Sequence, residues 1–188
     1  MSSTEYSVEQ REQLRDIAWR SIRHGLDEGR PLAVEPEDFA EPLRRQRACF
    51  VTLHRDAALR GCIGHLQAIQ PLVVDVAKNA YAAAFGDPRF PALREDEYDQ
   101  LQLEISVLSE SEPVEFADQQ DLLAQLRPGV DGLILSAPGN YRGTFLPSVW
   151  EQLPEPTRFL EHLKLKAGLP ADYWSDEIQV ERYTTESF

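Results

Sequence analysis

The chain has 188 residues, of which 42% are hydrophobic and 27% charged, a composition typical of a folded globular protein rather than a disordered or fibrous one. Its 19 Lys and Arg against 32 Asp and Glu give a net charge of -13, which repels phosphate backbones and argues against nucleic-acid binding. Two cysteines are too few for a disulfide framework, residues 1–10 lack the basic and apolar runs of a secretory signal, and no apolar stretch is long enough to span a membrane. We therefore expect an acidic, cytoplasmic protein in a reducing setting.

The first part of the chain predicts a helix, a strand pair and a second helix. Ser7 and Gln10 match a capping box, and apolar residues at helical spacing predict an N-terminal helix over about 7–29. A short apolar run then predicts a buried strand, and after a polar break two glycines mark the returning strand of a hairpin. Pro71 begins a helix with an apolar face, which a glycine ends. The expected strands cover residues 48–53 and 58–66, and this helix covers 71–86.

The rest of the chain predicts further strands and two helices. Residues 101–108 alternate apolar and polar side chains, which is the clearest strand pattern in the sequence. Asp118 and Thr157 are candidate N-caps of two helices, and clusters of Pro and Gly separate the remaining strands. We expect the helices over 118–126 and 157–168 and the strands over 133–135, 141–146 and 178–183.

A weak internal repeat relates the two halves. Arg60-Gly61 and Arg142-Gly143 each lie in the second strand of a predicted hairpin and lead through a proline to an amphipathic helix. Because the strands come in hairpins rather than in alternating βαβ units, we expect an α+β fold. No long polar linker separates the halves, so we expect them to share one core.

The most informative segment is Leu59-Arg60-Gly61-Cys62-Ile63-Gly64. Its glycines would let the backbone approach a ligand closely, and the arginine could bind an anion or stabilise a thiolate. In the alternative interpretation, Gly61 and Gly64 mark a bulge and Cys62 is a small buried side chain. The sequence leaves both interpretations open.

The register of the predicted hairpin follows from its turn. A tight turn centred between Arg55 and Asp56 would place Cys49 directly across from Cys62. In a reducing setting we expect this pair to be two thiols rather than a structural disulfide.

Metal binding is not favoured by the pattern. Cys62 and His65 form a Cys-x-x-His pair, but their odd separation places them on opposite faces of a regular strand. A glycine bulge would change these directions, which leaves a Cys-His nucleophile pair open. His24, His54 and His162 are scattered and are expected at the surface. No phosphate-binding loop or serine-hydrolase elbow occurs, so we predict neither a metal nor a cofactor.

These motifs together resemble the AMME chromosomal region protein family, also called the AmmeMemoRadiSam system protein A domain. The matching segments, in the family's order, are residues 50–53, 59–64, 87–90, 104–108, 129–133 and 145–149. The resemblance implies a single AMMECR-type domain over 1–188, with repeat-like halves of about 45–100 and 101–183. It also implies one barrel-like, largely antiparallel sheet and a cleft near the cysteine motif. His65 stands where the family often has threonine.

The resemblance further implies a set of site residues. It places Asp87, Arg89 and Glu104 near the same cleft, where a buried carboxylate would need an arginine partner. In the functional interpretation Arg60 and Arg89 bind an anionic group, and Glu104 orients them. In the structural interpretation Arg89 pairs with Asp87 or Glu104 and fixes the loop to the sheet. With Cys62 as the candidate catalytic residue, the candidate ligand-binding residues are Arg60, Gly61, Gly64, His65, Asp87, Arg89 and Glu104.

Two functional hypotheses remain. The family resembles proteins encoded beside a Memo-type, dioxygenase-like protein and a radical S-adenosylmethionine protein, and no reaction follows from the resemblance. The first hypothesis is an enzyme or accessory component of that system, in which Cys62 acts as a nucleophile or thiol donor toward a small anionic molecule. The alternative is a non-catalytic protein-interaction or scaffold domain in which Cys62 is structural. Neither hypothesis involves nucleic acid or a membrane.

Overall fold

The computed structural model describes residues 5–188, which form two compact units. The first unit runs to Leu108 and includes Glu186–Phe188, and the second is Ser109–Thr185. Residues 1–4, part of the segment predicted not to be a signal, lie outside the described residues. Each unit has its own cluster of buried apolar side chains, where we expected one shared core. Two clusters form because each unit has a sheet and helices that cover it.

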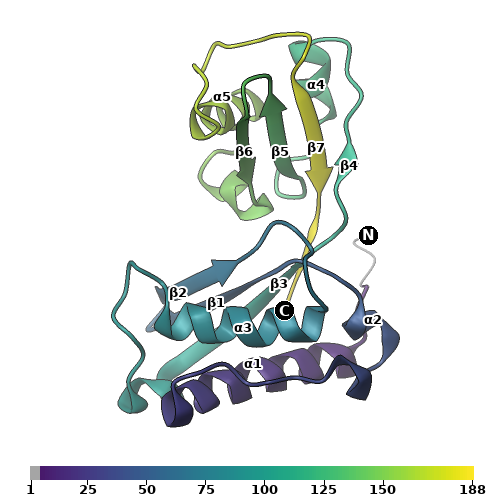
Figure 1. Ribbon diagram of the computed structural model, residues 1–188. Helices are drawn as coiled ribbons and strands as arrows, with labels where there is room; N and C mark the ends of the chain where they lie inside the picture. The colour runs from purple at the N-terminus through teal and green to yellow at the C-terminus, as the bar shows by residue number, and fades with distance from the viewer. Residues whose placement is uncertain (1–4) are drawn as a thin grey trace. The chain divides into compact units, whose positions relative to one another are not determined.

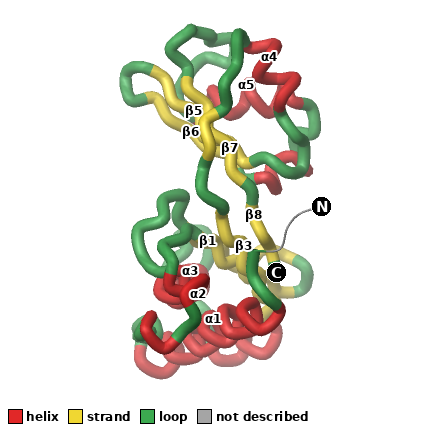
Figure 2. The backbone as a smooth tube through the Cα atoms, turned by 90° about the vertical axis from the view of Figure 1, so that its right-hand side faces the viewer, coloured by secondary structure: helices red, strands yellow, loops and turns green. Residues whose placement is uncertain are grey.

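The first unit contains a four-stranded sheet covered by helices (Figures 1 and 2). The strand order is β2-β1-β3-β8, and β1 pairs antiparallel with both β2 and β3. Helix α3 packs on β1 and β2, and α1 packs along α3. The strands are β1 (Cys49–Arg55), β2 (Ala58–Gly64), β3 (Leu101–Leu108) and β8 (Thr185–Ser187). The helices are α1 (Val8–Glu28), η1 (Pro36–Asp38), α2 (Glu41–Arg44), α3 (Leu72–Phe85) and η2 (Glu95–Gln100).

Helix α1 confirms the predicted N-terminal helix and its capping box. The Ser7 hydroxyl accepts from the Gln10 N–H, and the Gln10 side chain accepts from the Ser7 N–H. Gly29 follows the helix in the left-handed region at φ 69°. Most of the apolar stripe is buried in the core of the first unit, where α1 packs against α3, which explains why this amphipathic helix is stable in the fold.

The predicted register of the β1–β2 hairpin is wrong. The turn is Asp56-Ala57, with φ of 53° and 61°, so that Arg55 pairs with Ala58. An alanine at positive φ is sterically disfavoured, so residue preferences within the polar break did not favour this turn position. A bulge at Arg60 shifts the register again, and Thr52, not Cys49, lies opposite Cys62.

This register places the two cysteines on opposite faces of the first sheet. Cys49, Val51 and Leu53 are fully buried toward α3, whereas Thr52 and Cys62 alternate to the other side. We call that side the outer face and define it by the half-buried or exposed residues Phe50, Thr52, His54, Cys62, Gln102, Glu104 and Ser106.

The second unit has a sheet in the order β4-β7-β5-β6. Helix α5 begins at Pro156 rather than at the predicted Thr157 cap, because proline is well suited to the first helical position. No helix within residues 5–188 has both the length and the apolar character needed to cross a bilayer. The strands are β4 (Glu112–Pro113), β5 (Gly132–Ala137), β6 (Tyr141–Phe145) and β7 (Gln179–Tyr183). The helices are α4 (Gln119–Gln125), η3 (Pro147–Glu151) and α5 (Pro156–Lys166).

The internal repeat has a structural counterpart. In each unit a hairpin is followed by a helix and by a third strand that pairs with the first strand of the hairpin: β1–β2, α3, β3 and β5–β6, α5, β7. Gly61 lies opposite Leu53, and Gly143 lies opposite Leu135. Gly61 lies against Ala83 of α3, and Gly143 lies against Ala167, the C-cap residue of α5.

The α+β class with antiparallel sheets is confirmed, whereas the single barrel-like sheet is not. The strands of residues 5–188 form two four-stranded sheets, and neither closes into a barrel. Strand β3, which we assigned to the second half, belongs to the first sheet, because Leu101 to Val107 pair with β1.

Candidate functional site

Cys62 is half-buried on the outer face of the first sheet. The hydroxyl of its cross-strand neighbour Thr52 donates to the Cys62 sulfur at 3.3 Å. Glu104 lies opposite Thr52 on the next strand, so a thiol, a hydroxyl and a carboxylate form one row across three strands. Within residues 5–188, no histidine, lysine or carboxylate hydrogen-bonds to this sulfur. The thiol therefore accepts a hydrogen bond from Thr52, and no base within the described residues is hydrogen-bonded to it.

Asp87 and Arg89 cover the free edge of β2 at Cys62. The Cys62 N–H donates to Asp87 Oδ2 at 3.0 Å, and Arg89 Nη2 donates to the Cys62 carbonyl oxygen at 3.4 Å. Two further hydrogen bonds, of 3.0 and 2.7 Å, join the Arg89 guanidinium to the Asp87 carboxylate. This guanidinium holds the pKa of the buried Asp87 well below its usual range. The pair satisfies backbone groups of an edge strand, as the structural interpretation of Asp87 and Arg89 expected.

Arg89 also presents positive charge beside Cys62. Its side chain is 55% exposed, and its Nη1 has no hydrogen-bond partner within residues 5–188. The N–H groups of Arg89 Nη1 are therefore free to donate hydrogen bonds to an anion. Glu104, which we expected to orient Arg60 and Arg89, contacts neither, because it lies two strands away from Cys62 and is exposed.

Arg60 belongs to a different cluster. Its Nε and Nη2 donate to the two oxygens of Glu97 at 2.9 and 3.0 Å, and only 8% of the residue is exposed. Glu97 also accepts from Arg55 Nη1 and from the Arg94 N–H, and the Arg60 guanidinium lowers its pKa to about 2. Arg60 thus links the hairpin to η2. Its guanidinium is committed to this buried ion pair rather than directed to the surroundings of Cys62.

The two glycines of the motif are required by packing. A Cβ at Gly61 would overlap the Ala83 carbonyl oxygen of α3, and one at Gly64 would overlap Cys49 backbone and the Phe50 ring. Close approach of α3 to β2 therefore depends on Gly61. The predicted role of these glycines in ligand binding stays a prediction.

His65 lies on the helix side, away from Cys62. Its Nδ1 is 3.1 Å from Asp75 Oδ1, and its side chain is 42% exposed. The side chains of Cys62 and His65 therefore point to opposite sides of the sheet, as expected from their odd separation. The described part of the chain contains no group of three His, Cys, Asp or Glu residues able to hold a metal ion.

Sequence reasoning missed the buried network around Asp75. This carboxylate is 1% exposed and accepts hydrogen bonds from the Cys49 N–H, the Cys49 thiol, Asn79 Nδ2 and Gln70 Nε2. Burial, followed by the charge of Asp75, raises the pKa of the Cys49 thiol well above its usual value. An acidic residue on the apolar face of the predicted helix was the signal available in the sequence. The network ties the start of α3 to β1.

Comparison with known proteins identifies the family to which this chain belongs. The family model AMMECR1 matches residues 15–188, and the chain therefore belongs to the AMMECR1 family. A protein of Methanothermobacter thermautotrophicus is 37% identical over 174 residues, covering 92% of this chain and 90% of that protein. Protein MJ0810 of Methanocaldococcus jannaschii is 38% identical, covering 90% and 85%.

A solved structure has the same fold. The crystal structure of the uncharacterized protein PH0010 from Pyrococcus horikoshii matches with a TM-score of 0.80 at 36% identity. The match covers 94% of this chain and 89% of that one. The similarity therefore extends over both units.

Proposed function

We propose that this protein is an accessory component of a system with a Memo-type protein and a radical S-adenosylmethionine protein, and that the surroundings of Cys62 bind a small anionic ligand. The observation that most strongly supports the anion site is the guanidinium of Arg89. It contacts the Cys62 carbonyl, is more than half exposed, and keeps one nitrogen free. A half-buried thiol and a cation at the same strand edge suit a ligand with a carboxylate or phosphate group.

Binding or presentation of a ligand fits this geometry better than self-contained catalysis. The Thr52 hydroxyl donates to the Cys62 sulfur, but a nucleophilic cysteine usually needs an adjacent base as well. Among the residues that the structure describes, none supplies that base by hydrogen bonding to the sulfur. A partner protein would then supply the chemistry.

The second candidate function is a non-catalytic docking domain with a structural Cys62. It is supported by the packing roles of the motif: Gly61 packs on α3, and Arg60 is committed to Glu97. In that case the outer face would bind a protein surface rather than a small anion.

Thermal stabilisation by anions separates the two functions. A ligand that binds only the folded state raises the melting temperature with its concentration. We expect inorganic phosphate or succinate, at constant ionic strength, to stabilise the wild type and not Arg89→Gln. Arg94→Gln is a matched control, because Arg94 makes the same two-pronged ion pair with Asp96 at an exposed site.

Copurification tests the partnership. Tagged wild-type protein should retain the Memo-type or the radical S-adenosylmethionine protein from its own cells. No anion effect, together with full partner capture by Cys62→Ser and Arg89→Gln, would favour the docking domain. Capture of neither protein by the wild type would contradict the proposed partnership.

A further inference from the structure

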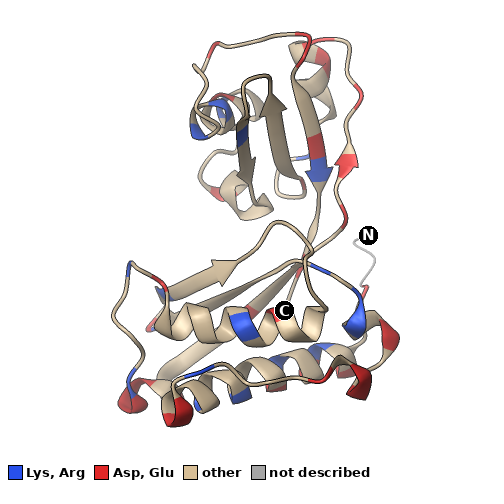
Figure 3. Cartoon of the chain, in the orientation of Figure 1, with Lys and Arg blue, Asp and Glu red and all other residues tan. Residues whose placement is uncertain are grey.

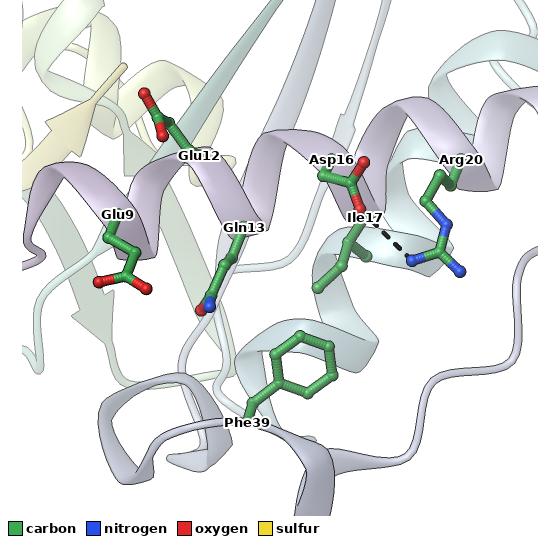
Figure 4. A pocket seen from close by; sticks show the side chains of 7 residues that line it. All are labelled: Glu9, Glu12, Gln13, Asp16, Ile17, Arg20 and Phe39. Atoms are coloured by element: carbon green, nitrogen blue, oxygen red, sulfur yellow. Dashed lines mark hydrogen bonds and ion pairs between the residues drawn. The ribbon is translucent and has the colours of Figure 1, made fainter.

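A groove lies beside α1, between this helix and the chain around Phe39 (Figure 4). Its volume is about 330 Å³, at the small end of the range for ligand pockets. It belongs to the helical layer and not to the outer face of the sheet, so it is separate from the surroundings of Cys62. The lining residues are Glu9, Glu12, Gln13, Asp16, Ile17, Arg20 and Phe39.

The floor of the groove is apolar. Ile17 is 1% exposed, and Phe39 is half-buried against the same core. Figure 4 shows the Gln13 and Ile17 side chains directed from α1 toward the Phe39 ring. An aliphatic chain laid along the groove would cover this ring, and a cation at its end would interact favourably with the ring face.

Carboxylates outnumber cations on the rim of the groove, where three acidic residues and one arginine lie; Figure 3 shows acidic and basic residues interspersed along the first unit. Asp16 is paired with Arg20 at 3.3 Å, with both side chains more than 60% exposed. Glu9 and Glu12 have no cationic partner within residues 5–188. The exposed Glu37 and Asp38 of η1 directly precede Phe39. The local excess of negative charge favours a cationic occupant and repels an anionic one.

We propose that this groove binds a lysine- or arginine-bearing segment of a protein partner. Glu9 and Asp16 are seven residues apart on α1, which corresponds to about 10 Å along the helix axis. Basic side chains at i and i+4 of a partner helix are separated by about 6 Å, so two of them fit along this length. Their aliphatic stems cover Phe39 and Ile17, and their charged ends lie among the carboxylates. The volume is sufficient for two such side chains, and no described group of three ligands suits a metal ion.

The test uses the full chain and a fluorescein-labelled helical peptide with lysines at i and i+4 and leucines between them. Fluorescence anisotropy measures the dissociation constant for the wild type, for the double variant Glu9→Gln/Glu12→Gln and for a matched control. The control, Glu151→Gln/Glu155→Gln, removes the same charge from exposed positions of the second unit. Loss of two exposed ion pairs predicts about fivefold weaker binding in the groove variant and less than about twofold in the control.

Three results would overturn the proposal. The wild type could bind the lysine peptide no better than a peptide in which glutamates replace the lysines. The groove variant and the control variant could also lose affinity for the lysine peptide equally. Spermine could also displace the peptide with the same dependence on Glu9 and Glu12, which would make the groove a polyamine site. Phe39→Leu should retain binding and Phe39→Ala should weaken it, with unfolding curves showing that each variant is folded.

Discussion

Replacement of Gly61 by alanine should destabilise the first unit strongly. The added Cβ would lie well inside the 3.0 Å that real Cβ atoms keep from other atoms, and its neighbour is the rigid carbonyl oxygen of Ala83 in α3. Strand and helix must therefore move apart, and overpacking of this kind costs about 3 kcal/mol. At Gly143 the nearest atoms of Ala167 are 2.9 to 3.0 Å away, and at Gly86 the nearest atom is 3.2 Å away. We expect about 1 kcal/mol at Gly143 and almost no change at Gly86.

The assay is thermal unfolding followed by far-UV circular dichroism. A loss of about 3 kcal/mol lowers the melting temperature by roughly 6 to 12 °C. Hydrogen exchange of peptides from α3 and α5 assigns each transition to its unit, because Gly61 faces α3 and Gly143 faces α5. A Gly61→Ala protein with wild-type stability would refute the packing argument and leave ligand binding as the remaining predicted role of Gly61.

Three further predictions concern buried polar groups. Asp75→Asn places an NH2 group among hydrogen-bond donors, so we expect the free energy of unfolding, measured by urea titration, to fall by about 3 kcal/mol. An unchanged urea midpoint would contradict the role of the network. Glu97 has its pKa lowered from 4.5 to about 2 by Arg60, so its stabilisation is full above pH 4.5 and is lost as the pH falls toward 2. Glu97→Gln should therefore lose less stability than the wild type between pH 6 and 3 in thermal melts, and equal losses would refute this role. Cys49 is fully buried with a raised pKa, so mass spectrometry should find it unmodified by iodoacetamide at pH 8 until the protein unfolds; native labelling would show that the site opens.

Local patterns predicted the main elements well. The capping box at Ser7 and the alternation over 101–108 each reflect interactions within one segment, and α1 and β3 follow them closely. The Arg-Gly echo also corresponds to a real structural repeat, since Gly61 and Gly143 have equivalent places in the two units.

Pairings between distant segments could not be predicted in the same way. The division of strands between two sheets depends on which strands meet, and β3 joins β1 although the repeat pattern suggested a boundary before it. A turn with Ala57 at positive φ and a bulge at Arg60 moved Cys62 opposite Thr52.

The candidate site was predicted in part. The contact of Asp87 and Arg89 with the cysteine strand is present, although the sequence alone could not choose between Asp87 and Glu104 as the arginine's partner. Glu97 was missed as the partner of Arg60, because a carboxylate in a polar segment has no local feature that marks it as buried.

The proposed anion site at Cys62 is tested most directly by comparing alkylation of this thiol by iodoacetate and by iodoacetamide. The two reagents react alike with thiolates but differ in charge, so the ratio of their rates reports the local field and not the pKa of the thiol. If Arg89 attracts anions to Cys62, the ratio of the iodoacetate rate to the iodoacetamide rate should fall about threefold in Arg89→Gln and stay unchanged in Arg94→Gln. The same ratio in the wild type and in Arg89→Gln would contradict an anion site at Cys62.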